Sequence, residues 1–118
     1  MSILKEWQTM KVKIESYSDK YSKYFYDLNH NWLSESFYVE EYDEKVLKNC
    51  KEEIIDKGGY IFFALYNTEV VGTMALIPRG KSIYELNKMA VKKNLRGNGI
   101  GHQSVSYTHL TLPTKRIV

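Results

Sequence analysis

The chain has 118 residues, of which 43% are apolar and 26% charged, enough for one small hydrophobic core but not for a second domain. Seventeen Lys and Arg against fourteen Asp and Glu leave a net charge of +3, too small an excess to indicate a nucleic-acid or membrane-surface protein. Cys50 is the single cysteine, so neither an intrachain disulfide nor a Cys/His metal site is expected. The longest apolar run, 60–66, is far shorter than a membrane span. These features predict a soluble, cytoplasmic protein.

The first half of the chain predicts one strand followed by two helices. Met10, Val12 and Ile14 alternate with charged residues, the period-2 pattern of a strand with one buried face. Apolar residues then recur twice at helical spacing, and Gly58-Gly59 ends the second helix. The first helical stripe consists of Tyr21, Tyr24, Phe25, Leu28 and Trp32, and the second of Val46, Leu47, Cys50 and Ile54.

Three strands are expected in the next part of the chain. The runs 60–66 and 70–77 are rich in branched and aromatic residues, and the polar turn between them is typical of a β-hairpin. Pro78-Arg79-Gly80 interrupts the pattern, and 83–91 then predicts a fourth strand. The predicted order is therefore one strand, two helices and three strands.

A glycine-rich run follows the last of these strands. In Arg96-Gly97-Asn98-Gly99-Ile100-Gly101 the glycines alternate, which lets the backbone turn tightly and lets main-chain N–H groups converge on an anion. Arg96, with Lys92 and Lys93 before it, adds positive charge. The run is no dinucleotide fingerprint, because no acidic residue follows it, and no Walker loop, because Gly-Lys-Ser/Thr is absent. On the residues alone, an anion-binding loop and an ordinary flexible turn both stay open.

Glu85-Leu-Asn-Lys-Met-Ala-Val91 followed by the glycine run resembles motif A of the GNAT acetyltransferase superfamily, and the likeness extends over residues 10–103. It implies an α/β (α+β) fold with a mixed, mainly antiparallel sheet flanked by helices, in the order β-α-α-β-β-β-(α). It also implies an N-acetyltransferase that moves an acetyl group from acetyl-CoA to a primary amine, without a metal or nucleic acid. Many members dimerise, which leaves a homodimer of the full-length parent open. The alternative is a non-catalytic acyl-CoA-binding or regulatory module.

The resemblance also implies roles for particular residues. The backbone of strand 83–91 would pair with the pantetheine arm of acetyl-CoA, and the glycine run would hold its pyrophosphate. Glu85 would be the general base, because an alkylamine is almost fully protonated at neutral pH and must lose a proton before it attacks. An ion pair of Glu85 with Lys88 or another neighbour is the plainer alternative. The cofactor-binding residues implied are Met89, Ala90, Val91, Arg96, Gly97, Asn98, Gly99, Ile100 and Gly101.

The stretch 29–44 combines aromatic and acidic residues. In the family, the segment between the first two helices often shapes the acceptor pocket, and such a rim would suit a cationic amine. A solvated helix start with half-buried aromatic rings is the other interpretation. The residues concerned are Trp32, Phe37, Tyr38 and Tyr42 with Glu35, Glu40, Glu41, Asp43 and Glu44.

The end of the chain departs from the family pattern. After Gln103, poor helix formers and Pro113 stand where a helix should follow, so no helix is expected. Read as codons, Val105–Thr114 resembles the end of a transposase adapter used for sequencing libraries, although a genuine short strand is the alternative. The division is then 1–104, the N-terminal portion of a GNAT domain, and 105–118, a non-native tail. A fragment truncated after motif A is expected to fold poorly and to be inactive.

Overall fold

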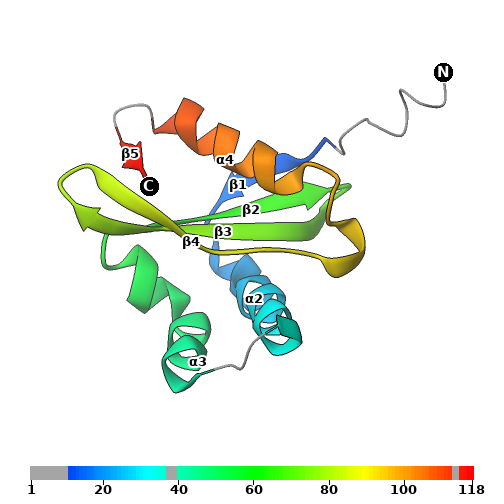
Figure 1. Cartoon of the computed structure of the whole chain (residues 1–118), viewed down its shortest axis with the longest axis horizontal. Helices are drawn as coiled ribbons and strands as arrows, with labels where there is room; N and C mark the ends of the chain where they lie inside the picture. Colours follow the sequence, from blue (N-terminus) through cyan, green and yellow to red (C-terminus); the bar gives the residue numbers. More distant parts are fainter. Residues whose placement is uncertain (1–10, 37–39, 113–114) are drawn as a thin grey trace.

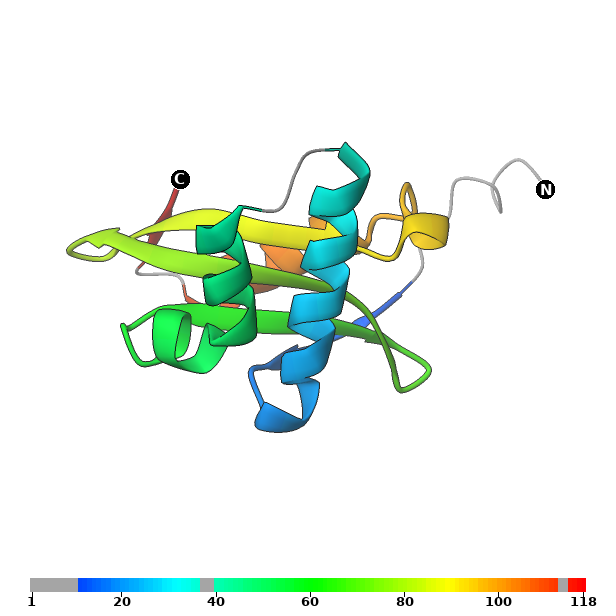
Figure 2. The ribbon, with the colours of Figure 1, turned by 90° about the horizontal axis from the view of Figure 1, so that it is seen from below.

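Five strands in the part of the chain that the structure describes form one sheet between two helical layers (Figure 1). The structure is a computed structural model that describes residues 11–36, 40–112 and 115–118. Helices α2 and α3 cover one face of the sheet, and α4 covers the other (Figures 1 and 2). The strands are β1 (Lys13–Ser16), β2 (Tyr60–Tyr66), β3 (Glu69–Gly80), β4 (Ile83–Val91) and β5 (Arg116–Ile117), and the helices are α2 (Ser22–Ser36), α3 (Glu41–Lys48) and α4 (Ile100–Thr111).

The sheet follows the chain order from β1 to β5. The first four strands are antiparallel neighbours, whereas β5 lies parallel to the start of β4, with Ile83 opposite Arg116 and Tyr84 opposite Ile117. The mixed, mainly antiparallel sheet implied by the sequence is confirmed. The predicted hairpin and fourth strand are present, while the first strand begins at Lys13.

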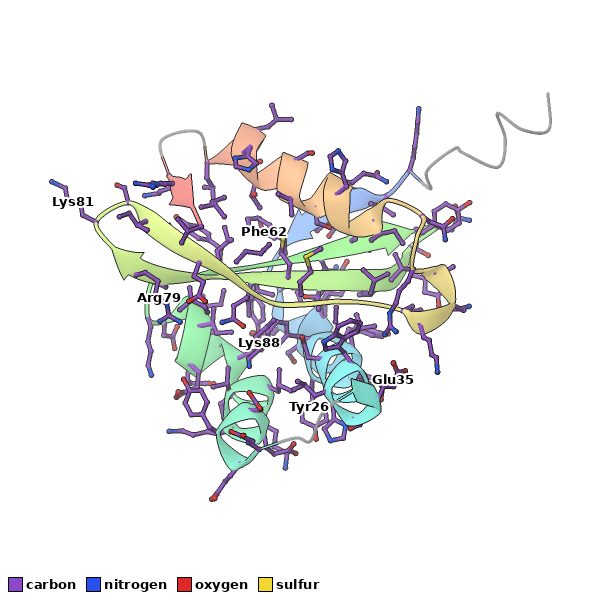
Figure 3. All side chains as sticks on the ribbon, viewed as in Figure 1. Tyr26, Glu35, Phe62, Arg79, Lys81 and Lys88 are labelled. Carbon is purple, nitrogen blue, oxygen red and sulfur yellow. The ribbon has the colours of Figure 1, made fainter. Side chains whose placement is uncertain are left out.

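The central strands are apolar without a break because helices cover both faces of the sheet. Phe63 of β2 is 0% exposed and packs with Phe25 on the side of α2 and α3. Phe62, its neighbour, points toward α4, where its ring lies 5.6 Å from that of Tyr107 (Figure 3). Two apolar layers therefore hold the sheet, one on each face.

The two helices on the first face follow the predicted stripes in part. Phe25 and Leu28 of α2 are buried, whereas Trp32 near its end is 37% exposed. The second predicted helix is interrupted, because α3 ends at Lys48 and a π-helical turn, Lys51–Ile55, continues its apolar stripe. Gly58 follows with a φ of +92°, a conformation that favours glycine and ends the helical segment as predicted.

The expectation that no helix follows Gln103 is wrong, since α4 extends to Thr111. Burial outweighs the weak helix propensity of this segment, because Tyr107 packs on Phe62 and Thr108 is 0% exposed. Within the helix, the hydroxyl of Ser104 donates to the carbonyl of Ile100 at 2.9 Å. The outer edge of the fourth strand is covered at its start, because β5 pairs with its first residues.

An extra residue interrupts β4 halfway along its length. Thr73 pairs with Ala90 and Ala75 pairs with Asn87, so that two residues of β4 oppose Met74. Lys88 lies in this bulge with a φ of +50°. Because β5 pairs only with the start of β4, no described strand lies beside the outer edge of β4 between Asn87 and Val91.

Candidate active site

Three connected cavities lie along β4 on the side of α2 and α3. Their volumes are about 230, 150 and 110 Å³, and neighbouring cavities share lining residues. Trp32 and Met89 border the first two cavities, and Asn87 and Lys88 border the last two. A channel therefore follows the open edge of β4 from the glycine run to the bulge.

The glycine run connects the end of β4 to α4. Gly97 has a φ of +85° and Gly99, the N-cap of α4, has a φ of +77°, both in the region that other residues adopt only with strain. The side chain of Asn98 donates to the Leu95 carbonyl at 2.9 Å and holds the turn closed. A Cβ at Gly101 would meet the terminal methyl of Met89, so the Met89 side chain reaches from β4 to the first turn of α4. The structure thus brings the predicted run 97–101 beside Met89.

Arg96 points away from the glycine run and toward α2. Its Nη1 donates to a carboxylate oxygen of Glu35 at 3.2 Å, its Nε donates to the Val91 carbonyl at 3.1 Å, and its guanidinium lies 4.7 Å from the centre of the Trp32 ring. Lys93 also lies 3.8 Å from Glu35, which Figure 3 labels on α2. The cations predicted to surround the run are therefore partly neutralised by α2.

Glu85 lies on β4 opposite Ile77, before the bulge. The Nε of Arg79 donates to its carboxylate at 2.5 Å, and the two side chains are 40% and 51% exposed. Glu85 does not line any of the three cavities described above. The plainer interpretation, an ion pair with a neighbour, is thus what the structure contains, but the neighbour is Arg79 rather than Lys88.

Lys88 instead pairs with Asp43 of α3. The Nζ of Lys88 lies 2.8 Å from a carboxylate oxygen of Asp43, and both side chains are less than one-fifth exposed, at 18% and 19%. Figure 3 shows Lys88 on the face of the sheet that α2 and α3 cover. Sequence reasoning missed the bulge that gives Lys88 this direction, because no proline or glycine marks it.

The acidic residues of the predicted rim are largely paired. Glu44 accepts a hydrogen bond of 2.5 Å from the Tyr26 hydroxyl, and Lys48 lies 3.3 Å from it. The Tyr26 hydroxyl is the main cause that lowers the pKa of Glu44, and the same hydrogen bond raises the pKa of Tyr26. With Glu35 and Asp43 also in ion pairs, the rim presents less free negative charge than its composition indicates. Phe37 and Tyr38 lie outside the described residues.

The described part of the chain holds no group of three or more side chains able to bind a metal ion. No helix within the described ranges is long and apolar enough to cross a membrane.

Comparison with known proteins identifies the family of this chain. Residues 7–108 match the acetyltransferase (GNAT) family, and the chain belongs to this family. None of the curated proteins compared with the chain matches it significantly.

Solved structures share the fold at low sequence identity. A GNAT-family acetyltransferase from Staphylococcus aureus Mu50 is 23% identical, with a TM-score of 0.74 over 87% of this chain and 66% of that one. An aminoglycoside 6'-N-acetyltransferase complexed with coenzyme A is 20% identical, with a TM-score of 0.69 over 86% and 56%. A GNAT-family acetyltransferase from Brucella melitensis in complex with acetyl-CoA is 15% identical, with a TM-score of 0.73 over 88% and 70%. The chain thus spans less than two thirds of the first two structures.

Proposed function

We propose that this domain transfers the acetyl group of acetyl-CoA to a primary amine beside β4. The observation that carries the proposal is the open edge of β4, which leads from the glycine run at the start of α4 to the bulge at Lys88. An open strand edge suits an extended amide-containing arm, and a helix start preceded by glycines suits a pyrophosphate. Two of the similar structures contain coenzyme A or acetyl-CoA.

The residues fit acetyl-CoA as a substrate in three places. The backbone of Met89, Ala90 and Val91 would pair with its pantetheine arm, and their side chains would at the same time serve the core. The amides of residues 97–101 would hold the pyrophosphate. Arg96 would reach the phosphates only after it leaves Glu35 and Trp32.

The reaction is a direct acyl transfer. The amine nitrogen forms a bond to the acetyl carbonyl carbon, the carbon–sulfur bond breaks, and the coenzyme A thiolate leaves and takes up a proton. A base must accept the proton that the amine loses, and Glu85 is the proposed base. Because Arg79 occupies one oxygen of Glu85, the second oxygen would take the proton, directly or through water.

The same ion pair favours a second candidate, a non-catalytic acyl-CoA-binding module, because Glu85 faces Arg79 and lines none of the three cavities. Acetyl-CoA incubated with the chain and a panel of amines distinguishes the two functions. Release of free thiol together with an acetylated amine in the mass spectrum supports the enzyme. Saturable acetyl-CoA binding without thiol release across the panel supports the binding module.

Residues 105–118 remain predicted to be a non-native tail. The exposed Leu110, at 83%, supports this, although Val105 and Tyr107 of the same helix pack against the sheet. The expectation of inactivity rested in part on the absence of a helix after Gln103, whereas the structure has α4 there. Sequencing the source DNA through the Gln103 codon tests the tail directly. A reading frame that encodes Val105–Val118 in the genome would contradict it.

A further inference from the structure

Asn29 is a buried polar residue on the face of α2 that looks toward the bulge of β4. It is 2% exposed, and it lines the cavity of about 150 Å³ together with Trp32, Asn87 and Lys88. A buried amide is costly unless its polar atoms find partners, so its position requires an explanation.

The orientation of the Asn29 amide follows from its hydrogen bond. Its Nδ2 donates to the Phe25 carbonyl at 2.9 Å, and since a carbonyl can only accept, the opposite end of the amide must be Oδ1. Within the described residues, Oδ1 accepts no hydrogen bond, yet no fully buried side-chain oxygen there lacks a partner. Oδ1 therefore borders accessible space, and the cavity is the space that Asn29 lines.

The cavity lies beside the edge of β4 along which the pantetheine arm of acetyl-CoA would extend. It shares Trp32 and Met89 with the cavity that runs toward Arg96 along the open edge of β4. Its volume of about 150 Å³ is below the roughly 300 to 1,000 Å³ of a site that encloses a whole small molecule. It can therefore take one end of a ligand and not all of it.

Among the side chains that line this cavity, Asn29 offers an oxygen that accepts no hydrogen bond within the described residues. Lys88 is neutralised by Asp43 at 2.8 Å, so this pair offers no strong field to an incoming group. A carbonyl oxygen with an unused lone pair attracts an N–H group. We propose that Asn29 positions the acceptor, accepting an N–H from a primary amine at the end of a slender alkyl chain; this inference rests on the proposed function.

Butylamine binding to the coenzyme A complex tests the proposal. Trp32 borders the cavity, so in a Trp7→Phe background its fluorescence reports occupancy by n-butylamine. We expect saturable binding, weakened about 10-fold by Asn29→Ala, the scale of one lost hydrogen bond.

Asn49→Ala is the matched control, because Asn49 makes the same bond, from its Nδ2 to the Lys45 carbonyl at 3.0 Å, but is exposed. The coenzyme A affinity should stay within about 2-fold in both variants, because neither side chain borders the glycine run.

Asn29→Asp separates positioning from a structural role. The aspartate side chain of this variant keeps an acceptor oxygen but cannot donate to the Phe25 carbonyl. If Asn29 served only to make that bond, Asn29→Asp would weaken butylamine binding as much as Asn29→Ala does. Positioning predicts that it restores butylamine binding. The proposal is overturned if Asn29→Ala leaves the butylamine affinity unchanged, if Asn29→Asp fails to restore it, or if butylamine does not bind while coenzyme A does. Failure of coenzyme A itself to bind would overturn the proposed function instead.

Discussion

At the scale of single residues, the role of Glu85 as the general base can be tested directly. If Glu85 is the base, Glu85→Gln should lower kcat at least about 100-fold and abolish the acid limb of the pH–rate profile. Glu69→Gln is the control, because Glu69 is also an exposed strand glutamate paired with a cation, Lys92. Initial rates of thiol release as a function of pH measure both variants. An unchanged profile in Glu85→Gln would assign the proton to another acceptor.

Gly97 isolates the effect of backbone conformation. Its φ is +85°, and no atom lies within 4 Å of the place where a Cβ would stand. Gly97→Ala should therefore lower the free energy of unfolding by about 1 kcal/mol through backbone strain alone. Urea denaturation measures this, with Gly80→Ala as control, since a Cβ there would meet only ordinary contacts at 3.8 Å. Equal stability of the Gly97→Ala variant would mean that the loop changes its conformation.

The hydrogen bond between Tyr26 and Glu44 predicts how the stability of the fold depends on pH. The Tyr26 hydroxyl lowers the pKa of Glu44 in the folded chain, so this group contributes stability above its unfolded pKa and loses it as the pH falls through the folded value. Tyr26→Phe removes the main cause, so acid unfolding should begin at a higher pH. Circular dichroism during acid titration measures the midpoint, with Tyr24→Phe on the same helix as the control. A midpoint unchanged by Tyr26→Phe would show that the hydrogen bond does not act on Glu44.

Helix α4 differs from the other elements in how it is packed. Thr108 is 0% exposed, and its hydroxyl donates to the carbonyl of Val105 at 2.6 Å, with no partner outside its own helix among the described residues. Thr108→Val keeps the shape and removes a buried hydroxyl, and should raise the free energy of unfolding by about 1 kcal/mol. Thr111→Val, at an exposed position of the same helix, should change it by less than about 0.5 kcal/mol. Destabilisation by Thr108→Val, measured by urea denaturation, would mean that the hydroxyl is needed.

The elements that could be predicted are those whose sequence pattern agrees with their packing. The run 60–66 is apolar throughout because helices cover both faces of β2, and α2 follows its aromatic stripe. Helix α4 was missed because its residues favour a helix only when Tyr107 and Thr108 are buried. Local sequence pattern and helix propensity do not predict such long-range contacts.

The candidate site was predictable where backbone geometry decides it. Glycines at 97 and 99 signalled the left-handed turn, and both adopt it. The bulge at Lys88 carries no such signal, so neither its pairing with Asp43 nor the cavity beside Asn29 could be foreseen. Side-chain partners that lie far apart in the chain, such as Arg96 and Glu35, depend on the assembled fold.

At the scale of the whole molecule, the fold brings the open edge of β4 and the start of α4 together. The sheet leaves the outer edge of β4 open beyond β5, and α4 begins beside the end of that edge. Helices α2 and α3 close the opposite side and supply Trp32 and Tyr42 to the channel. The site therefore needs both helical layers, and a change that loosens either should weaken binding of acetyl-CoA.

Calorimetric titration of the chain with acetyl-CoA tests the central claim most directly. The account predicts saturable binding with a Kd below about 1 mM, the upper end of ordinary substrate affinities. It also predicts that Gly99→Ala, which strains a residue at φ +77°, weakens binding about 10-fold or more, while Gly80→Ala does not. A folded chain that shows no saturable heat, or one that binds equally well with Gly99→Ala, would contradict the assignment of this loop and edge to acetyl-CoA.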